Sequence, residues 1–483
     1  MAFVKDNDRL RLQHLAWRAG FGETMPVITD WQNKRRNELV NKIVMGPAKA
    51  PLEPLYVIHD TDMPDYSRNK DMSTDQRKEI RQMNEQAIRD LNVSWMLEMI
   101  GSPNALREKM ALFWHGHFAC RTQNVFFNQQ LLQVIRENAL GNFADLLTAV
   151  SKSAAMLQFL NNQQNRKQHP NENFAREVME LFTMGRGHYS EQDVKEAARA
   201  FTGWGFDDTG TFVFRKNAHD EGRKTVLGKT GNFDGDDVLK ILCEQEQTAR
   251  FITRKIYAYF VNDQVDEDQV NKLAHKFYTS SYDIHGLMQH IFTSDFFYDN
   301  ANVGNRIKSP VELLVGIRRT IPMLFDQEEV MLLFQRIMGQ LLFYPPNVAG
   351  WPGGRAWIDS SSLMFRMRVP QVILYSQTLS VMPKELVPEM GEGQHYKATL
   401  AINDFLKRQY AKKINARINW EPYLSALSAI PRESLAPAIA QHLLGANNLP
   451  SALLDKYADA ATRESYIKTV TIDVMSTPEY QLC

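Results

Sequence analysis

Cysteine is scarce in this chain of 483 residues, which has three cysteines, at positions 120, 243 and 483. They are too few and too widely spaced for a disulfide framework or a cysteine-based zinc site. The chain also lacks any run of roughly 18 apolar residues, so no membrane-spanning helix is predicted. Its first residues, 1–9, lack the apolar core of a signal peptide, so we expect a cytoplasmic location.

The chain also has no excess of positive or negative charge, because 56 Lys and Arg residues balance 56 Asp and Glu residues. Nucleic-acid binders carry a strong basic excess, so a nucleic-acid partner is not expected. The chain has no G-x-x-x-x-G-K-[ST], G-x-S-x-G or H-E-x-x-H motif, and no G-x-G-x-x-G that opens a helix after a strand. These absences count against kinases, α/β-hydrolases, zincins and dehydrogenases.

Apolar residues at helical spacing dominate the sequence, and they predict a mainly α protein. We expect a multi-helical core at 1–385, a small β-hairpin or flap at about 204–233, and a C-terminal helical subdomain at 386–483, after a linker within 382–396. The hairpin strands are expected at 211–215 and 224–228. The main expected helices are 10–19, 74–100, 104–114, 142–160 with a break near 151–153, 171–185, 190–201, 235–242, 247–261, 266–278, 283–294, 310–319, 328–338 and 361–377.

The helix expected at 171–185, with the sequence NENFAREVMELFTMG, concentrates charge on an amphipathic element. At 100° per residue its apolar stripe contains Phe174, Val178, Leu181 and Phe182. Glu177 lies at the edge of that stripe and is the carboxylate expected to point inward. Arg176 and Glu180 lie opposite with Glu172, and Arg176 can pair with either glutamate four residues away. The alternative interpretation is an ordinary solvated charged face.

Two histidines, His115 and His117, flank Gly116. The glycine favours a break after the helix at 104–114, and in extended backbone alternating residues share a face. Two such imidazoles together with Glu177 would form a set of two histidines and one carboxylate for Zn, Fe or Mn. The alternative is two packed histidines that hydrogen-bond to backbone or carboxylate groups.

A second group with acid–base chemistry is the His219–Asp220 pair, in which the aspartate would orient the imidazole. The competing interpretation is a pair of turn residues at a loop tip. The candidate catalytic residues are therefore Glu177, Glu180, Arg176, His219 and Asp220.

Tryptophans in glycine-rich segments offer flat apolar faces for a sugar or another ring-bearing ligand. Arg355 can hold an anionic group. The tryptophans are equally suited to plugging long loops onto the core. The candidate ligand-binding residues are Trp204, Trp351, Trp357 and Arg355.

Several of these motifs, in this order, resemble a bacterial family of unknown function, domain-of-unknown-function family 1800. They lie at 15–22, 113–118, 171–185, 200–204, 219–220 and 346–353, and the resemblance covers about residues 8–380. It implies a shared site at His115, His117, Asn173, Arg176, Glu177, Glu180, His219, Asp220 and Trp351. It also implies a link to a second family that looks like phosphatases and sulfatases. Many relatives carry export signals, and this chain shows none.

Two hypotheses remain. The first is a metal-dependent enzyme, hydrolytic with a Zn-like metal or oxidative with an Fe-like metal. The second is a non-catalytic protein that binds a carbohydrate or a phosphatase/sulfatase-like partner, in which the polar cluster is a buried structural network. A structure separates them by showing whether the histidines and Glu177 converge on an open hollow or are locked into contacts with the protein.

Overall fold

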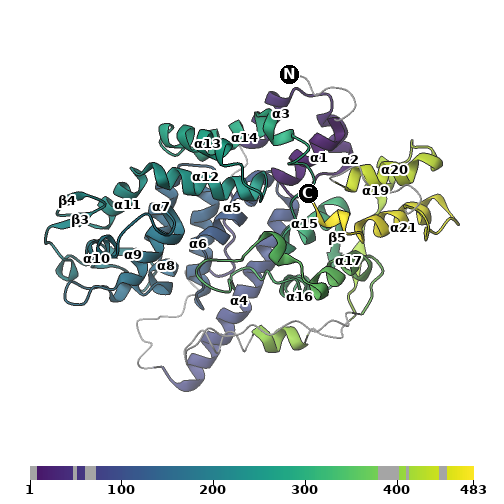
Figure 1. Ribbon diagram of the computed structural model, residues 1–483. Coiled ribbons are helices and arrows are strands. Elements are labelled where there is room, and N and C mark those ends of the chain that lie inside the picture. Colours follow the sequence, from purple (N-terminus) through teal and green to yellow (C-terminus); the bar gives the residue numbers. More distant parts are fainter. Residues whose placement is uncertain (1–7, 47–51, 60–71, 379–401, 409–412, 445–453) are drawn as a thin grey trace.

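The structure is a computed structural model that describes residues 8–46, 52–59, 72–378, 402–408, 413–444 and 454–483. It is mainly helical, as the periodicity predicts, and elongated (Figure 1). One end is a lobe built from α7 to α11 with two small hairpins. The middle contains α4, α5, α6, α12 and α15, and α19 to α21 form the other end.

The helices of the first half of the chain are α1 Asp8–Arg18, α2 Met25–Trp31, α3 Arg36–Met45, α4 Thr74–Gly101, α5 Ala105–His117, α6 Val125–Asn138, α7 Phe143–Ser151, α8 Ala154–Phe159, α9 Glu172–Glu177 and α10 Glu191–Ala200. Those of the second half are α11 Gly235–Cys243, α12 Glu246–Phe260, α13 Glu267–Thr279, α14 Ile284–Thr293, α15 Pro310–Thr320, α16 Val330–Ile337, α17 Ser360–Leu374, α19 Glu421–Ala426, α20 Arg432–Leu443 and α21 Arg463–Met475.

Local signals in the sequence explain several helix ends. Ser73 caps α4 through a capping box, and α4 ends at Gly101, as expected. Ser153 accepts a hydrogen bond from the first turn of α8, which places the break between α7 and α8 where the sequence predicts it. Pro310 begins α15 behind the capping residue Ser309. Ser190 and Asp193 form a capping box at the start of α10, which the sequence places at this point.

Within the described residues, six short strands form three separate two-stranded antiparallel sheets. The region 204–233 is the β insertion that the sequence predicts, but the expected pairing within it is wrong. The segments expected to pair with each other instead form one strand in each of two consecutive hairpins, because each has a nearer partner across a short turn. The strand pairs are β1 Trp204–Phe206 with β2 Phe212–Phe214, β3 Lys224–Val226 with β4 Lys229–Gly231, and β5 Met323–Phe325 with β6 Ala416–Ile418.

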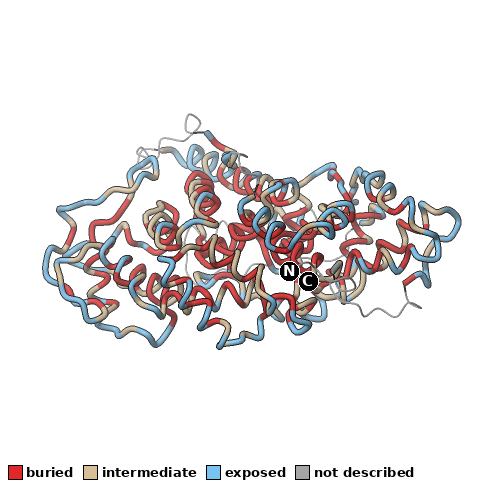
Figure 2. Tube along the Cα trace, turned by 90° about the horizontal axis from the view of Figure 1, so that it is seen from above, coloured by how far each residue is buried: buried red, intermediate tan, exposed pale blue. Residues whose placement is uncertain are grey.

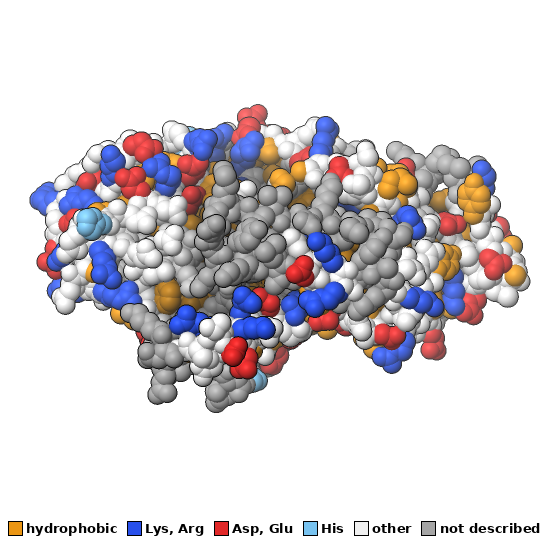
Figure 3. Space-filling model, turned by 90° about the horizontal axis from the view of Figure 1, so that it is seen from below, with side chains coloured by type: hydrophobic (Ala, Val, Ile, Leu, Met, Phe, Trp, Pro, Cys, Tyr) orange, Lys and Arg blue, Asp and Glu red, His pale blue; other side chains and the backbone are white. Residues whose placement is uncertain are grey.

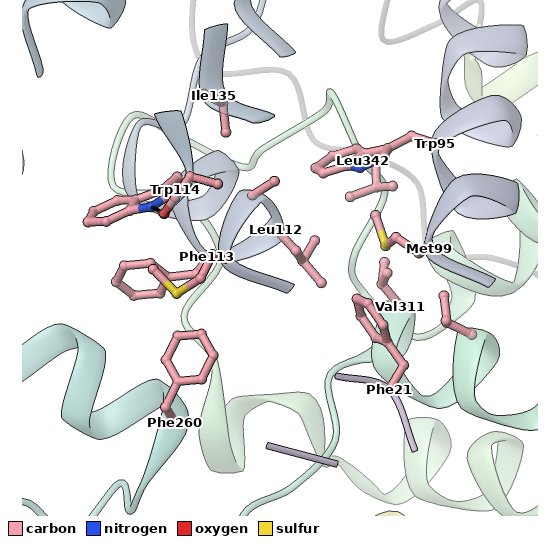
Figure 4. Close-up of a cluster of buried hydrophobic side chains, with 14 of the residues drawn as sticks. Phe21, Trp95, Met99, Leu112, Phe113, Trp114, Ile135, Phe260, Val311 and Leu342 are labelled. Atoms are coloured by element: carbon pink, nitrogen blue, oxygen red, sulfur yellow. Dashed lines mark hydrogen bonds between the residues drawn. The ribbon is translucent and has the colours of Figure 1, made fainter. Parts of the chain in front are cut away.

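The hydrophobic core runs through the middle of the molecule, where buried chain concentrates in Figure 2. Figure 4 shows α5 at its centre, with Phe113 facing Phe260 of α12, and Trp95 of α4 lying near Leu342. Helix α5 is buried on all sides, including its polar residues Glu108 and Lys109. Burial of these charges is tolerable because they are paired: Glu108 with Arg136 at 3.0 Å, and Lys109 with Glu312.

The C-terminal part of the chain is joined to this core. Strand β6 completes the sheet of β5, and the last residues lie against the segment before α15. The amide of Lys308 donates to the carbonyl of Gln481 at 2.8 Å, and the amide of Cys483 donates to that of Arg306 at 2.8 Å. Tyr480 is fully buried. The linker expected within 382–396 lies outside the described residues.

The surface seen in Figure 3 carries acidic and basic side chains side by side, as the balanced composition implies. Across the described residues, no helix combines the length and apolar character that crossing a membrane requires. The longest, α4, has a solvated first half rich in charged and polar side chains.

Candidate functional site

The His-Gly-His segment is helical, and the expectation of an extended segment is wrong. Helix α5 continues through His117, because the core packs against it on every side and the flexibility of Gly116 is not used. On a helix, residues two apart diverge by about 200°. His115 and His117 therefore point in different directions and contact different parts of the protein.

His115 is an acceptor inside an aromatic cluster. Its Nε2 accepts a hydrogen bond from the backbone amide of Phe343 at 3.2 Å. Its ring centroid lies 5.1 Å from that of Trp95 and 5.5 Å from that of Trp351. Burial lowers the pKa of His115 to about 3, so the ring is neutral. The structure thus brings His115 together with Trp351, but the Nε2 lone pair is already in use.

His117 supports the helix that carries the acidic motif. Its Nε2 lies 3.1 Å from the carbonyl oxygen of Phe182, which only accepts, so Nε2 carries the proton. Its Nδ1 is then the acceptor for the amine of Lys255, at 3.2 Å. Burial, reinforced by Lys255, holds the pKa of His117 well below 6.5. Both ring nitrogens are occupied, as in the expected alternative of packed histidines.

The segment 171–185, here called the acidic motif, changes helix type in its middle. Helix α9 ends at Glu177, and residues Val178–Thr183 form a π-helix, in which the Thr183 hydroxyl donates to the carbonyl of Val178 at 2.7 Å. The wider turn invalidates the assumption of 100° per residue beyond Glu177. Met179 is fully buried, although the wheel leaves it outside the apolar stripe, and Leu181 is only partly buried. Such π segments are frequent at functional sites.

The charged residues of this motif lie at the surface, as the solvated-face alternative describes. Arg176 pairs with Glu172 at 3.1 Å, as expected, and also with Glu191 of α10 at 2.7 Å, a partner outside the motif. Glu180 does not pair with Arg176. It accepts hydrogen bonds from Arg186 at 3.0 Å and from the Tyr189 hydroxyl at 2.5 Å.

Glu177 is half-buried, and none of its described neighbours forms a hydrogen bond or ion pair with it. Its pKa is raised by burial and by Glu180, and is partly lowered by Arg176. The structure does not join Glu177, His115 and His117 into one set. In the described parts of the chain, no cluster of three or more His, Cys, Asp or Glu residues is arranged to hold a metal ion.

The tryptophans serve mainly as core residues. Trp204 is 2% exposed and packs against Phe201, and Trp357 is 5% exposed, so neither presents a face to a ligand. Trp351 is partly exposed beside His115, and Arg355 is exposed. A Cβ at Gly350 would clash with the carbonyl oxygen of Gly116, which explains the glycine and shows how closely this loop packs on the end of α5.

His219 differs from the other two candidate histidines. Its Nδ1 lies 2.9 Å from the carbonyl oxygen of Thr202, so Nδ1 carries the proton and the lone pair is on Nε2. The Thr202 hydroxyl also accepts from Nδ1, at 3.2 Å. No described residue bonds to Nε2, and that nitrogen is not among the enclosed polar atoms without a partner. The imidazole of His219 is therefore anchored through Nδ1, and its Nε2 has no hydrogen-bond partner among the described residues.

Asp220 does not orient His219, which corrects the sequence-based expectation. Its carboxylate faces Arg199 of α10, with Oδ2 2.7 Å from Nε and Oδ1 3.2 Å from Nη2. Adjacent residues on an extended strand or loop point to opposite sides, so the neighbouring aspartate cannot reach the ring. These bonds from Arg199 lower the pKa of Asp220. The orienting group is the backbone of Thr202.

The backbone of the loop around His219 is held in place by hydrogen bonds from buried groups. Lys224 is 1% exposed and donates to the carbonyl oxygens of Asp220 and Gly222, the latter at 3.1 Å. The amide of Asp220 donates to the Thr202 hydroxyl at 2.8 Å. A buried lysine that solvates loop carbonyls costs desolvation free energy, and burial lowers its pKa. Such a supporting layer is typical of loops that position a functional side chain.

His219 lines a surface hollow of about 490 Å³. Its other lining residues are Lys167, Lys216, Asn217, Asp220 and Glu221. Lys167 belongs to the loop before α9, and its amide donates to the carbonyl of Ala218 at 2.9 Å, which fixes the two loops side by side. Of these other lining residues, only Asp220 was a candidate from the sequence. The only available signal for the rest was their closeness in sequence to His219 and to the acidic motif.

The fold and these contacts define a mainly helical protein in which a β insertion presents one imidazole to a surface hollow. The chain belongs to the family described as protein of unknown function (DUF1800), whose model matches residues 14–482. The match includes the C-terminal part, so membership extends beyond the range 8–380 inferred from motifs. Comparisons with curated proteins and with solved structures found no match.

Proposed function

We propose that the hollow at His219 binds an anionic small molecule, such as a phosphate ester, and that Nε2 of His219 exchanges a proton with it. The supporting observation is the open nitrogen. Of the three candidate histidines, His115 and His117 use their lone pairs within the protein, whereas His219 keeps Nε2 available beside a hollow. A base held through Nδ1 and free at Nε2 is the arrangement that general acid–base chemistry uses.

The charges of the hollow favour an anion. Lys167 and Lys216 are exposed in its wall, and the carboxylate of Asp220 is ion-paired with Arg199, which also pairs with Glu196. Glu221 is the one remaining acidic residue of the lining. Two ammonium groups and the amide of Asn217 supply donors for the oxygens of a phosphate or carboxylate. This proposal replaces the metal-centred hypothesis with a site built from imidazole and lysine.

Titration calorimetry with inorganic phosphate tests the site. The Lys167→Ala/Lys216→Ala variant removes both ammonium groups and is expected to weaken phosphate binding about tenfold or more, because each charge-assisted bond contributes about 1.5–3 kcal/mol. His219→Gln is also expected to bind phosphate more weakly, because it removes the imidazole that lines the hollow.

Lys240→Ala/Lys272→Ala is the matched control, since both lysines are exposed on helices away from the hollow lining. It is expected to bind within about twofold of wild type, because surface charge alone contributes little. Equal weakening of phosphate binding in the two double variants would show that only the net charge of the protein matters, which would contradict a specific site. Absence of binding to the wild type would contradict the proposal.

A further inference from the structure

Lys255 is a buried amine that the His219 site does not use. It lies on α12, and its Nζ donates to the carbonyl oxygen of Leu181 at 3.2 Å and to Nδ1 of His117 at 3.2 Å. It also lies over the ring of Phe251, 4.7 Å from the centroid. The residue as a whole is partly exposed, although its amine is largely buried. Among the described residues, no carboxylate forms an ion pair with it.

The surroundings of Lys255 favour the neutral amine. Helix α12, the π-helix and the end of α5 meet at Lys255, and the titratable group in contact with its amine is His117, which stays neutral. Burial lowers the pKa of Lys255 from 10.5 to about 8. At pH 7 roughly three hundred times more of such a group is neutral than of an exposed lysine.

The hydrogen-bond geometry leaves the amine lone pair free. A neutral amine has two N–H bonds and one lone pair, and the two acceptors, Leu181 and His117, match the two N–H bonds. A lysine without a counter-ion, beside an imidazole and an aromatic ring, is the environment in which enzymes use lysine as a nucleophile.

We infer that Lys255 is a reactive amine that condenses with small aldehydes or ketones. The lone pair attacks the carbonyl carbon, and the carbonyl oxygen takes up a proton to give a carbinolamine. Loss of the hydroxyl as water and of the remaining nitrogen proton gives the imine. The balance is one amine plus one carbonyl compound giving one imine and one water, with no change of oxidation state. This site is separate in its residues from the hollow at His219.

Competitive reductive methylation of the wild-type chain tests the inference. Limiting formaldehyde with cyanoborohydride traps each imine as a methylamine, and peptide mass spectrometry measures the rate at every lysine. At pH 7 Lys255 is expected to react at least about tenfold faster than the exposed Lys240 and Lys272, after allowance for its lower basicity and partial burial. Its rate is expected to level off near pH 8.

Two results would overturn the inference: a Lys255 rate no higher than that of the exposed lysines, or a rate that keeps rising up to pH 10 as theirs does. Either result would leave Lys255 with a structural role alone, as a cap of the π-helix. The measurement needs no variant of Lys255, so a folding defect cannot obscure the result. The result also does not depend on phosphate binding, so failure of this inference can be distinguished from failure of the proposed function.

Discussion

At the scale of single residues, the chemistry of each histidine follows from what its two nitrogens contact. The sequence identified His115, His117 and His219 as candidates, but their roles depend on partners distant in sequence: Phe343 for His115, Lys255 for His117 and Thr202 for His219. Residue type alone cannot supply these partners. Adjacency in sequence misled in one case, since Asp220 follows His219 but faces the other side.

The Asp220→Asn variant tests whether Thr202 or Asp220 orients the imidazole of His219. It weakens the two-point contact with Arg199, whose side chain is 27% exposed, and is expected to cost about 1 kcal/mol of unfolding free energy. The tautomer of His219 is expected to stay as in the wild type, because Thr202 holds Nδ1. Urea unfolding and imidazole ¹⁵N shifts measure the two effects. The control is Asp208→Asn, at an exposed position in the same insertion. A tautomer change in Asp220→Asn alone would restore the aspartate as the orienting group.

At the scale of elements, the π-helix Val178–Thr183 needs side chains to complete it. A π-helix leaves carbonyl groups at its C-terminal end without partners. His117 donates to Phe182, Lys255 donates to Leu181, and Gln247 donates to the carbonyl oxygen of Met184 at 2.8 Å. The apolar pattern predicted a helix at 171–185 but not its type, because helix type is decided by these contacts from α5 and α12.

Substitution of His117 tests this capping role. His117→Phe fits the aromatic surroundings but leaves the Phe182 carbonyl without its donor, so we expect a loss of about 1–3 kcal/mol of stability. His117→Gln keeps an amide donor and should recover part of the loss. Chemical denaturation in the presence and absence of a chelator gives the comparison. A stability difference that disappears with chelator would instead indicate a bound metal.

The element boundaries show what sequence patterns can and cannot decide. The starts of α4, α10 and α15 were predictable, because capping residues act within one turn. The end of α5 was not, because burial among distant helices extended it through Gly116. The strands at β2 and β3 were recognisable, yet their pairing was wrong, since strand propensity does not specify a partner.

At the scale of the whole molecule, folding places several ionisable groups in the core. Burial is the largest cause of a lowered pKa at His14, His115, His117 and His442, to about 3 for His115 and His442. All four are neutral in the folded chain and take up protons near pH 6.5 when it unfolds. Their contribution to stability is therefore complete above pH 6.5 and is lost as the pH falls.

The stability of the protein is accordingly expected to fall in mild acid. Each buried histidine contributes a slope of up to about 1.4 kcal/mol per pH unit below 6.5, so four together give as much as about 5 kcal/mol per unit. Urea unfolding at pH 7.5, 6.5 and 5.5 measures this slope. His14→Gln is expected to reduce it by about one histidine, whereas replacing the exposed His188 should leave it unchanged. A flat profile from pH 7.5 to 5.5 would contradict the burial of neutral histidines.

The open nitrogen of His219 is the feature on which the proposed function depends, and ¹⁵N-histidine NMR observes it directly. At a pH where the ring is neutral, Nδ1 of His219 should show a protonated shift and Nε2 an unprotonated one, with His219→Gln providing the assignment. Inorganic phosphate should move the Nε2 resonance in the wild type but not in Lys167→Ala/Lys216→Ala. A proton on Nε2, or an Nε2 resonance indifferent to phosphate, would contradict the account.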